Sequence, residues 1–214
     1  MARKTKEEAQ ETRNAILEAA VRVFAIKGVA RTSLDDIARE AGVTRGAIYW
    51  HFANKADLLN TLWDQVLLFY APLAEASENP DEPDPLGKME ALYLSFFTGM
   101  IEDQRQQQLF RLLFDDSDRS KDTEVIRQRH AQKRTERLKG IQITLSNAKA
   151  RGQLPPDFNV RLGAISVLAY IYGLIANWTM TPELFDVKQD VPHLIEGMMR
   201  MLRSGFTGGE LTGL

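Results

Sequence analysis

The sequence predicts an all-α fold, and three observations support that class. Apolar side chains recur every three or four residues along most of the chain, as on one face of a helix. Helix-capping residues such as Ser33, Thr44 and Asn54 precede these segments, and Gly28 and Gly42 follow two of them. The one run that resembles a strand, residues 47–52, has no similar run nearby to pair with, and a lone strand is not stable.

The first predicted helix covers residues 7–27. Gly28 ends it, because glycine readily adopts the backbone conformation that follows a helix. Its apolar stripe consists of Ala9, Ile16, Ala20, Val23 and Phe24.

Two short helices are expected next. Ser33, with Asp36 three residues later, resembles a capping box and starts a helix that ends at Ala41-Gly42. Thr44 can cap the following helix, where residues 44–52 read TRGAIYWHF. At 3.6 residues per turn, one side of that helix is apolar and packs on the helix before it. The other side carries Arg45, Tyr49 and Trp50, for which no core remains.

A pair of short helices joined by a glycine-containing turn is a helix-turn-helix, in which the second helix enters the DNA major groove. The outer side chains here can all donate hydrogen bonds to phosphates or base edges: Thr44, Arg45, Tyr49, Trp50 and His51. Gly46 allows close backbone approach, and Lys55 begins the next helix, where an anion is favoured. A plain helix pair in an all-α protein is the alternative.

Helices fill the rest of the chain. Asn54 can cap a fourth helix with an inward stripe of Leu58, Leu59, Leu62, Trp63, Val66, Phe69, Tyr70 and Leu73. Asp84-Pro85 starts a fifth helix to about residue 101, and a short helix through residues 109–114 follows it. After a loop at 115–122, helices are expected at about 123–150, 160–178 and 190–204, the last two capped by Asp157 and Asp190.

Residues 162–182, which include most of the helix at 160–178, contain no charged residue. A membrane span wants about 20 predominantly apolar residues, which this segment barely reaches, so burial on both sides is the better interpretation. One side, with Leu168 and Tyr172, can face the interior. The other, with Ile165, Ala169 and Gly173, can meet a partner helix, which predicts a homodimer that does not involve a membrane.

Composition argues against an enzyme. Cysteine is absent, and the only histidines are His51, His130 and His193, none spaced from another as metal ligands are. Neither a phosphate-binding glycine loop nor a G-x-S-x-G motif is present. We expect no cofactor and no metal. The polar N-terminus lacks the apolar region of a signal peptide, which favours a cytoplasmic protein.

Residues 15–59, AILEAAVRVFAIKGVARTSLDDIAREAGVTRGAIYWHFANKADLL, resemble the DNA-binding domain of the TetR/AcrR family of transcriptional regulators. The opening MARKTKEEAQETR, together with TRGAIYWHF, looks most like the family's repressors of multidrug efflux pumps. The resemblance implies a helix-turn-helix domain at 1–55, with its motif at about 33–52, and a ligand-binding and dimerisation domain at 56–214. A basic arm at Arg3, Lys4 and Lys6 would be a solvated tail or reach an adjacent groove.

Such a regulator would bind a double-stranded, palindromic operator and be released by a hydrophobic small molecule. Matched to the family motif, the DNA-binding residues would be Thr32, Ser33, Thr44, Arg45, Gly46, Tyr49, Trp50, His51 and Lys55. Inward apolar side chains suit an adaptable pocket, although each could be ordinary core: Val66, Phe69, Tyr70, Tyr93, Phe96, Met100, Phe110, Leu113, Phe114, Ile141, Leu168 and Tyr172. The alternative function is a helical small-molecule carrier or sensor without DNA binding.

Overall fold

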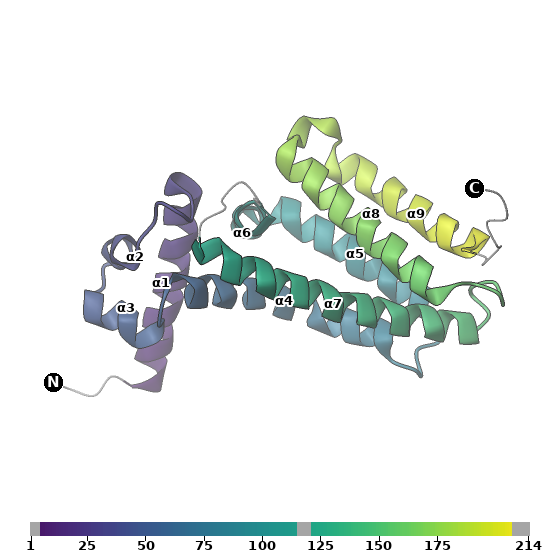
Figure 1. The fold of residues 1–214 in the computed structure, drawn as a ribbon, viewed down its shortest axis with the longest axis horizontal. Helices are drawn as coiled ribbons and strands as arrows, with labels where there is room; N and C mark the ends of the chain where they lie inside the picture. Colours follow the sequence, from purple (N-terminus) through teal and green to yellow (C-terminus); the bar gives the residue numbers. More distant parts are fainter. Residues whose placement is uncertain (1–4, 115–120, 207–214) are drawn as a thin grey trace. The chain divides into compact units, whose positions relative to one another are not determined.

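The computed structural model describes residues 5–114 and 121–206, and within them all regular structure is helical. The helices are α1 (Lys6–Lys27), α2 (Leu34–Glu40), α3 (Arg45–His51), α4 (Lys55–Glu78), α5 (Pro85–Glu102), α6 (Gln104–Phe114), α7 (Lys121–Ala150), α8 (Val160–Met180), the 3-10 turn η1 (Pro182–Leu184) and α9 (Val187–Ser204) (Figure 1). The all-α prediction is confirmed. Arg3 and Lys4 of the basic arm, and residues 115–120 of the expected loop, lie outside the described residues, whereas Lys6 is the first residue of α1.

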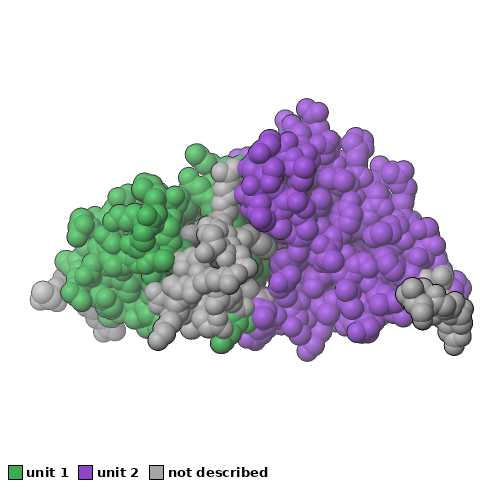
Figure 2. Space-filling view, turned by 45° about the horizontal axis from the view of Figure 1, so that its top comes forward, with its two compact units in different colours: residues 1–67, 104–130 green, residues 68–103, 131–214 purple. Residues whose placement is uncertain are grey.

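The chain forms two compact units (Figure 2). Unit 1 comprises residues 1–67 and 104–130, and unit 2 comprises residues 68–103 and 131–214. Helices α4 and α7 therefore contribute residues to both units. The predicted functional boundary between residues 55 and 56 concerns where DNA binding ends, and it stays a prediction.

In unit 1, α1 packs against α2, α3 and α6, and α2 packs against α3. Fully buried apolar side chains form the core of this unit, including Ile16, Phe24, Ile37, Ile48 and Phe52. The turn between α2 and α3 is tight because Gly42 has φ of 67° and the Val43 amide donates to the Ala38 carbonyl over 3.0 Å. This packing holds α3 by its inner side.

In unit 2, α9 packs against α5 and α8. The core contains Met89, Phe97, Leu145, Val167 and Ile195, all buried. The buried hydroxyls of Ser77 on α4 and Thr144 on α7 lie 3.1 Å apart.

Most predicted caps are present. The Ser33–Asp36 capping box starts α2, Thr44 caps α3 by accepting from the Ala47 amide, and Asp84 caps α5. The Asn54 side chain accepts from the Asp57 amide over 2.9 Å at the start of α4.

Two predicted caps are wrong. The α8 cap is Asn159, not Asp157, because the Asn159 side chain accepts from the Leu162 amide three residues on, over 3.1 Å. The α9 cap is Asp186, not Asp190. Asp186 accepts from the Gln189 amide, while the Asp190 carboxylate accepts from the Asp186 amide over 2.7 Å.

Helix α8 is the one helix, within the described part of the chain, long and apolar enough to cross a membrane by length and composition. A core helix of a soluble protein meets the same criterion. One side is buried through Ala164, Val167 and Ile171, whereas Leu162 and Ile165 on the other are 41% and 39% exposed. Helix α8 thus has one apolar side that is buried in the core and a second apolar side that is exposed.

Candidate nucleic-acid interface

The loop between α1 and α2 is held by hydrogen bonds within the protein. Gly28 has φ of 77° and receives a 2.8 Å hydrogen bond on its carbonyl from the hydroxyl of Thr32, a residue that is only 2% exposed. The Thr32 side chain is therefore directed into the protein, so a DNA contact of Thr32 would be made by its backbone. Ser33 is exposed and caps α2.

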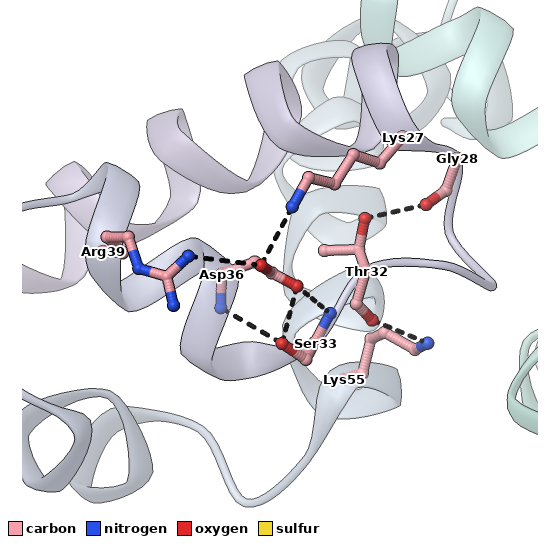
Figure 3. Close-up of polar contacts among 7 residues, drawn as sticks. All are labelled: Lys27, Gly28, Thr32, Ser33, Asp36, Arg39 and Lys55. Carbon is pink, nitrogen blue, oxygen red and sulfur yellow. Dashed lines mark hydrogen bonds and ion pairs between the residues drawn. The ribbon is translucent and has the colours of Figure 1, made fainter.

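Asp36 collects most of the polar contacts at the start of α2 (Figure 3). Its Oδ2 accepts from the Ser33 hydroxyl over 2.7 Å and from the Ser33 amide over 3.0 Å, while Oδ1 lies 2.9 Å from Lys27 Nζ. The Ser33 hydrogen bond, followed by that from Lys27, holds the pKa of Asp36 well below its usual range. The ionised carboxylate thus fastens α2 to the end of α1.

Lys55 lies at the first position of α4, and its ammonium is directed at the same loop (Figure 3). Its Nζ donates to the carbonyl oxygens of Val29 over 2.8 Å and Thr32 over 3.0 Å, with Ala30 at 3.5 Å. In this structure the charge therefore ties α4 to the loop. The predicted contact of Lys55 with a phosphate stays a prediction.

Helix α3 has the two sides that the sequence predicts. Ile48 and Phe52 are fully buried, whereas Trp50 is 73% exposed and Tyr49 is 46% exposed. Thr44, Arg45 and Gly46 are also exposed, and His51 is half-buried.

The outer side chains of α3 are arranged by ring and charge contacts. The Trp50 and His51 rings meet edge to face with centroids 4.5 Å apart, and the Arg45 guanidinium lies 5.6 Å from the Tyr49 ring centroid. Arg45 Nε also lies 3.4 Å from Asp35 Oδ1 on α2. Sequence reasoning missed Asp35, since no spacing rule connects it with a residue ten positions away on another helix.

The predicted ligand-binding residues are divided between the units. Val66 and Phe110 are buried in unit 1, and the side chains of Leu113 and Phe114 lie outside the described residues. In unit 2, Tyr70, Tyr93, Met100 and Ile141 are buried, while Phe96, Leu168 and Tyr172 are half-buried. Phe69 is 61% exposed, so its predicted inward placement is wrong.

Aromatic rings gather where α4 meets α5 in unit 2. The Tyr70 ring lies 5.1 Å from that of Phe96 and 4.9 Å from that of Phe69, between centroids. Burial, with a smaller contribution from the Asp103 carboxylate, raises the pKa of Tyr70 to about 12. Tyr70 is therefore a neutral phenol at physiological pH, and its hydroxyl lies 3.5 Å from the Phe96 carbonyl oxygen.

Two arginines of α7 contact predicted ligand-binding residues. The Arg134 guanidinium lies 4.4 Å above the Tyr172 ring centroid. Arg137 places Nη2 3.5 Å from the Tyr93 hydroxyl and Nη1 3.4 Å from the Glu78 carboxylate. The i, i+3 spacing of these arginines places them on the same side of α7 and could have identified them. The many other charged residues of α7 made this spacing hard to distinguish.

No cluster of metal-ligating side chains occurs in the described part of the chain.

The family model for bacterial regulatory proteins of the tetR family matches residues 16–62, and that for the C-terminal region of MAATS-type transcriptional repressors matches residues 84–204. The HTH-type transcriptional regulator TtgR of Pseudomonas putida is 45% identical over 203 residues, covering 95% of this chain and 97% of that protein.

Solved structures agree with these matches. NalD, the secondary repressor of the MexAB-OprM multidrug efflux pump in Pseudomonas aeruginosa, superposes with a TM-score of 0.81 at 34% identity, covering 92% of this chain and 98% of that one. The complex of SmeT, the repressor of the Stenotrophomonas maltophilia multidrug efflux pump SmeDEF, with triclosan gives a TM-score of 0.85 at 28% identity, covering 96% and 99%.

Proposed function

Because this chain belongs to the TetR family of bacterial regulatory proteins, and is a DNA-binding transcriptional repressor rather than an enzyme, we propose that it controls a multidrug efflux operon. It binds a palindromic operator as a dimer in the cytoplasm and is released by a hydrophobic small molecule. The observation that carries this proposal is the two-sided α3, with a buried inner side and exposed aromatic and basic side chains.

The exposed side of α3 suits a major groove. Tyr49 and Trp50 together present large rings with a hydroxyl and an indole N–H, and their backbone is held by the buried Ile48. A fixed backbone lowers the entropy lost when side chains are ordered on DNA. We assign base and phosphate contacts to Thr44, Arg45, Tyr49, Trp50 and His51, with Gly46 as the point of close approach.

The remaining residues of the predicted interface act through the backbone of unit 1. Ser33 is the N-cap of α2 and Lys55 is the first residue of α4, and amides in the first turn of a helix are suited to phosphate oxygens. Thr32 and the Lys55 ammonium hold the loop that positions these amides.

A dimer gives the repressor the two-fold symmetry of its operator. The uncovered side of α8 carries Leu162, Ile165 and Ala169, all exposed in a single chain. A Cβ added to Gly173 on the same side meets no atom within 4 Å, which leaves room for a second helix. We infer that α8 of one protomer packs there against its partner.

Release by a ligand requires a link from unit 2 to the helix-turn-helix formed by α2 and α3. Helix α4 supplies it within one element, because it begins at Lys55 in unit 1 and contains Tyr70 in unit 2. A ligand among the rings of unit 2 would displace the far part of α4 and thereby its first turn. The complex of the related SmeT with triclosan, an apolar aromatic compound, fits this class of effector.

The test is a gel-shift titration with DNA from upstream of the protein's own gene. Wild-type protein should form one discrete complex, and Trp50→Ala should weaken it at least tenfold. Leu184→Ala is the matched control, since it removes a large side chain that is 60% exposed in unit 2. Equal binding by all three proteins would refute the assigned face. Binding of triclosan without any DNA binding would leave the carrier or sensor function instead.

A further inference from the structure

Side chains from four helices of unit 2 form an arginine–tyrosine cluster, which consists of Glu78 (α4), Tyr93 (α5), Arg134 and Arg137 (α7) and Tyr172 (α8). Both guanidiniums lie over rings, Arg134 at 4.4 Å from the Tyr172 centroid and Arg137 at 5.8 Å from that of Tyr93. The two arginines and Tyr93 all act on the pKa of Tyr172, so these groups share one local field.

The charge of the cluster is not balanced. Glu78 is the single carboxylate in it and lies 3.4 Å from Arg137 Nη1. The Glu78 carboxylate occupies space that is open only because residue 140 is glycine, since a Cβ there would overlap Glu78 Oε1. Among the described residues no carboxylate lies within ion-pair distance of Arg134, whereas its neighbours Lys133 and Glu136 pair with each other over 2.8 Å. One positive charge is therefore left beside two phenol rings.

Part of the cluster is exposed to solvent. Arg134 is exposed and Tyr172 is half-buried, while 25% of the Arg137 side-chain surface is exposed. Burial raises the pKa of Tyr172 against the opposing effect of the two arginines, so the phenol stays neutral and does not itself cancel their charge.

A planar guanidinium pairs with carboxylates through two parallel hydrogen bonds and also stacks on aromatic rings. We propose that the arginine–tyrosine cluster binds the effector as an aromatic anion, with its carboxylate or phenolate on Arg134 and its ring against Tyr172. This inference rests on the proposed function, in which unit 2 binds the small molecule. It goes beyond that function by assigning the effector a negative charge.

The test compares two probes of the same shape, 2-naphthoate and its neutral amide, by titration calorimetry with full-length protein and no DNA. The carboxylate should bind about tenfold more tightly than the amide, a difference of about 1.4 kcal/mol. Arg134→Gln should abolish that preference. Glu78→Gln should increase it, because this variant removes the carboxylate that competes for Arg137. Opposite effects of two charge-neutralising variants would not arise from a general loss of packing.

Lys139→Gln is the control for net charge, since Lys139 is an exposed residue of α7 outside the cluster. It should leave the preference unchanged, and circular dichroism should show all variants folded. Equal affinity of the wild type for both probes, failure of both to bind, or a preference that survives in Arg134→Gln would each overturn the proposal. The gel shift is independent: a carboxylate preference without operator release leaves this inference standing and refutes the release mechanism.

Discussion

Arg105, at the start of α6, donates from Nε to the Glu18 carboxylate of α1 over 2.5 Å. Its Nη2 also donates to the Gln65 side-chain oxygen of α4 over 2.9 Å. Helix α6 begins two residues after α5 ends, at the point where the chain returns from unit 2 to unit 1. Arg105 thus links the start of α6 to α1, which packs against α2 and α3, and to α4, which carries Lys55.

Arg105→Gln is therefore expected to weaken the coupling between effector and operator. Coupling between such sites is typically about 1–3 kcal/mol, and a loosened α6 should transmit less of it. Global stability should change by less than about 1 kcal/mol, because both partners are partly exposed. The measurement is operator affinity with and without triclosan. Arg22→Gln, which breaks the comparable pair with Glu40, is the control. Identical triclosan effects in both variants would exclude Arg105 from the link.

Lys55→Met should destabilise unit 1 by about 1–3 kcal/mol, since it removes a charged donor from two part-buried carbonyl oxygens. Urea unfolding monitored by tryptophan fluorescence measures this loss. It should also lower operator affinity, because the loop at 29–32 positions α2. A salt slope smaller by about one would add a direct phosphate contact of the ammonium, whereas an unchanged slope would limit Lys55 to the loop.

Asp36→Asn should lower stability at pH 7 and remove part of the acid sensitivity of unit 1. The folded pKa of Asp36 lies below its ordinary value of 3.8, so the ionised carboxylate stabilises the fold above that pH. This contribution is lost as the pH falls from about 4 toward the lower folded value. Thermal melts at pH 7 and pH 3 should show a difference between wild type and variant that shrinks in acid. A difference that is independent of pH would contradict the assignment.

Gly173→Leu should separate the dimer and leave the protomer folded. The added side chain has open space in a single chain but none if a partner helix packs on α8, and overpacking typically costs about 1–3 kcal/mol. Light scattering at micromolar concentration measures the mass. Ser146→Leu, at an exposed site on α7, should stay dimeric. A wild type that is monomeric under these conditions would refute the dimer.

Local signals in the sequence were sufficient to predict the helix-turn-helix of α2 and α3. The caps at Ser33, Thr44 and Asn54 depend on residues three positions apart, and the inner side of α3 follows from helical periodicity alone. Contacts between distant segments were not predictable in this way. The Lys55 ammonium donates to carbonyls more than twenty positions away, and no spacing rule in the sequence predicts these partners.

Periodicity also failed where the apolar run was too dense. Residues 66–70 read VLLFY, so any side of α4 could have been the inner one. The structure buries Val66 and Tyr70, four positions apart, and leaves Leu68 and Phe69 exposed. The partners of Arg134 and Arg137 come from other helices, and no pattern within α7 distinguished these arginines from its solvated charges.

Hydroxyl-radical footprinting of the upstream DNA determines whether two copies of α3 contact a symmetric operator. Wild-type protein should protect two inverted segments of the same sequence, and both should lose protection together in Tyr49→Ala at a concentration where the wild type saturates. Protection of a single segment, uniform protection along the duplex, or a footprint unchanged in Tyr49→Ala would contradict the account.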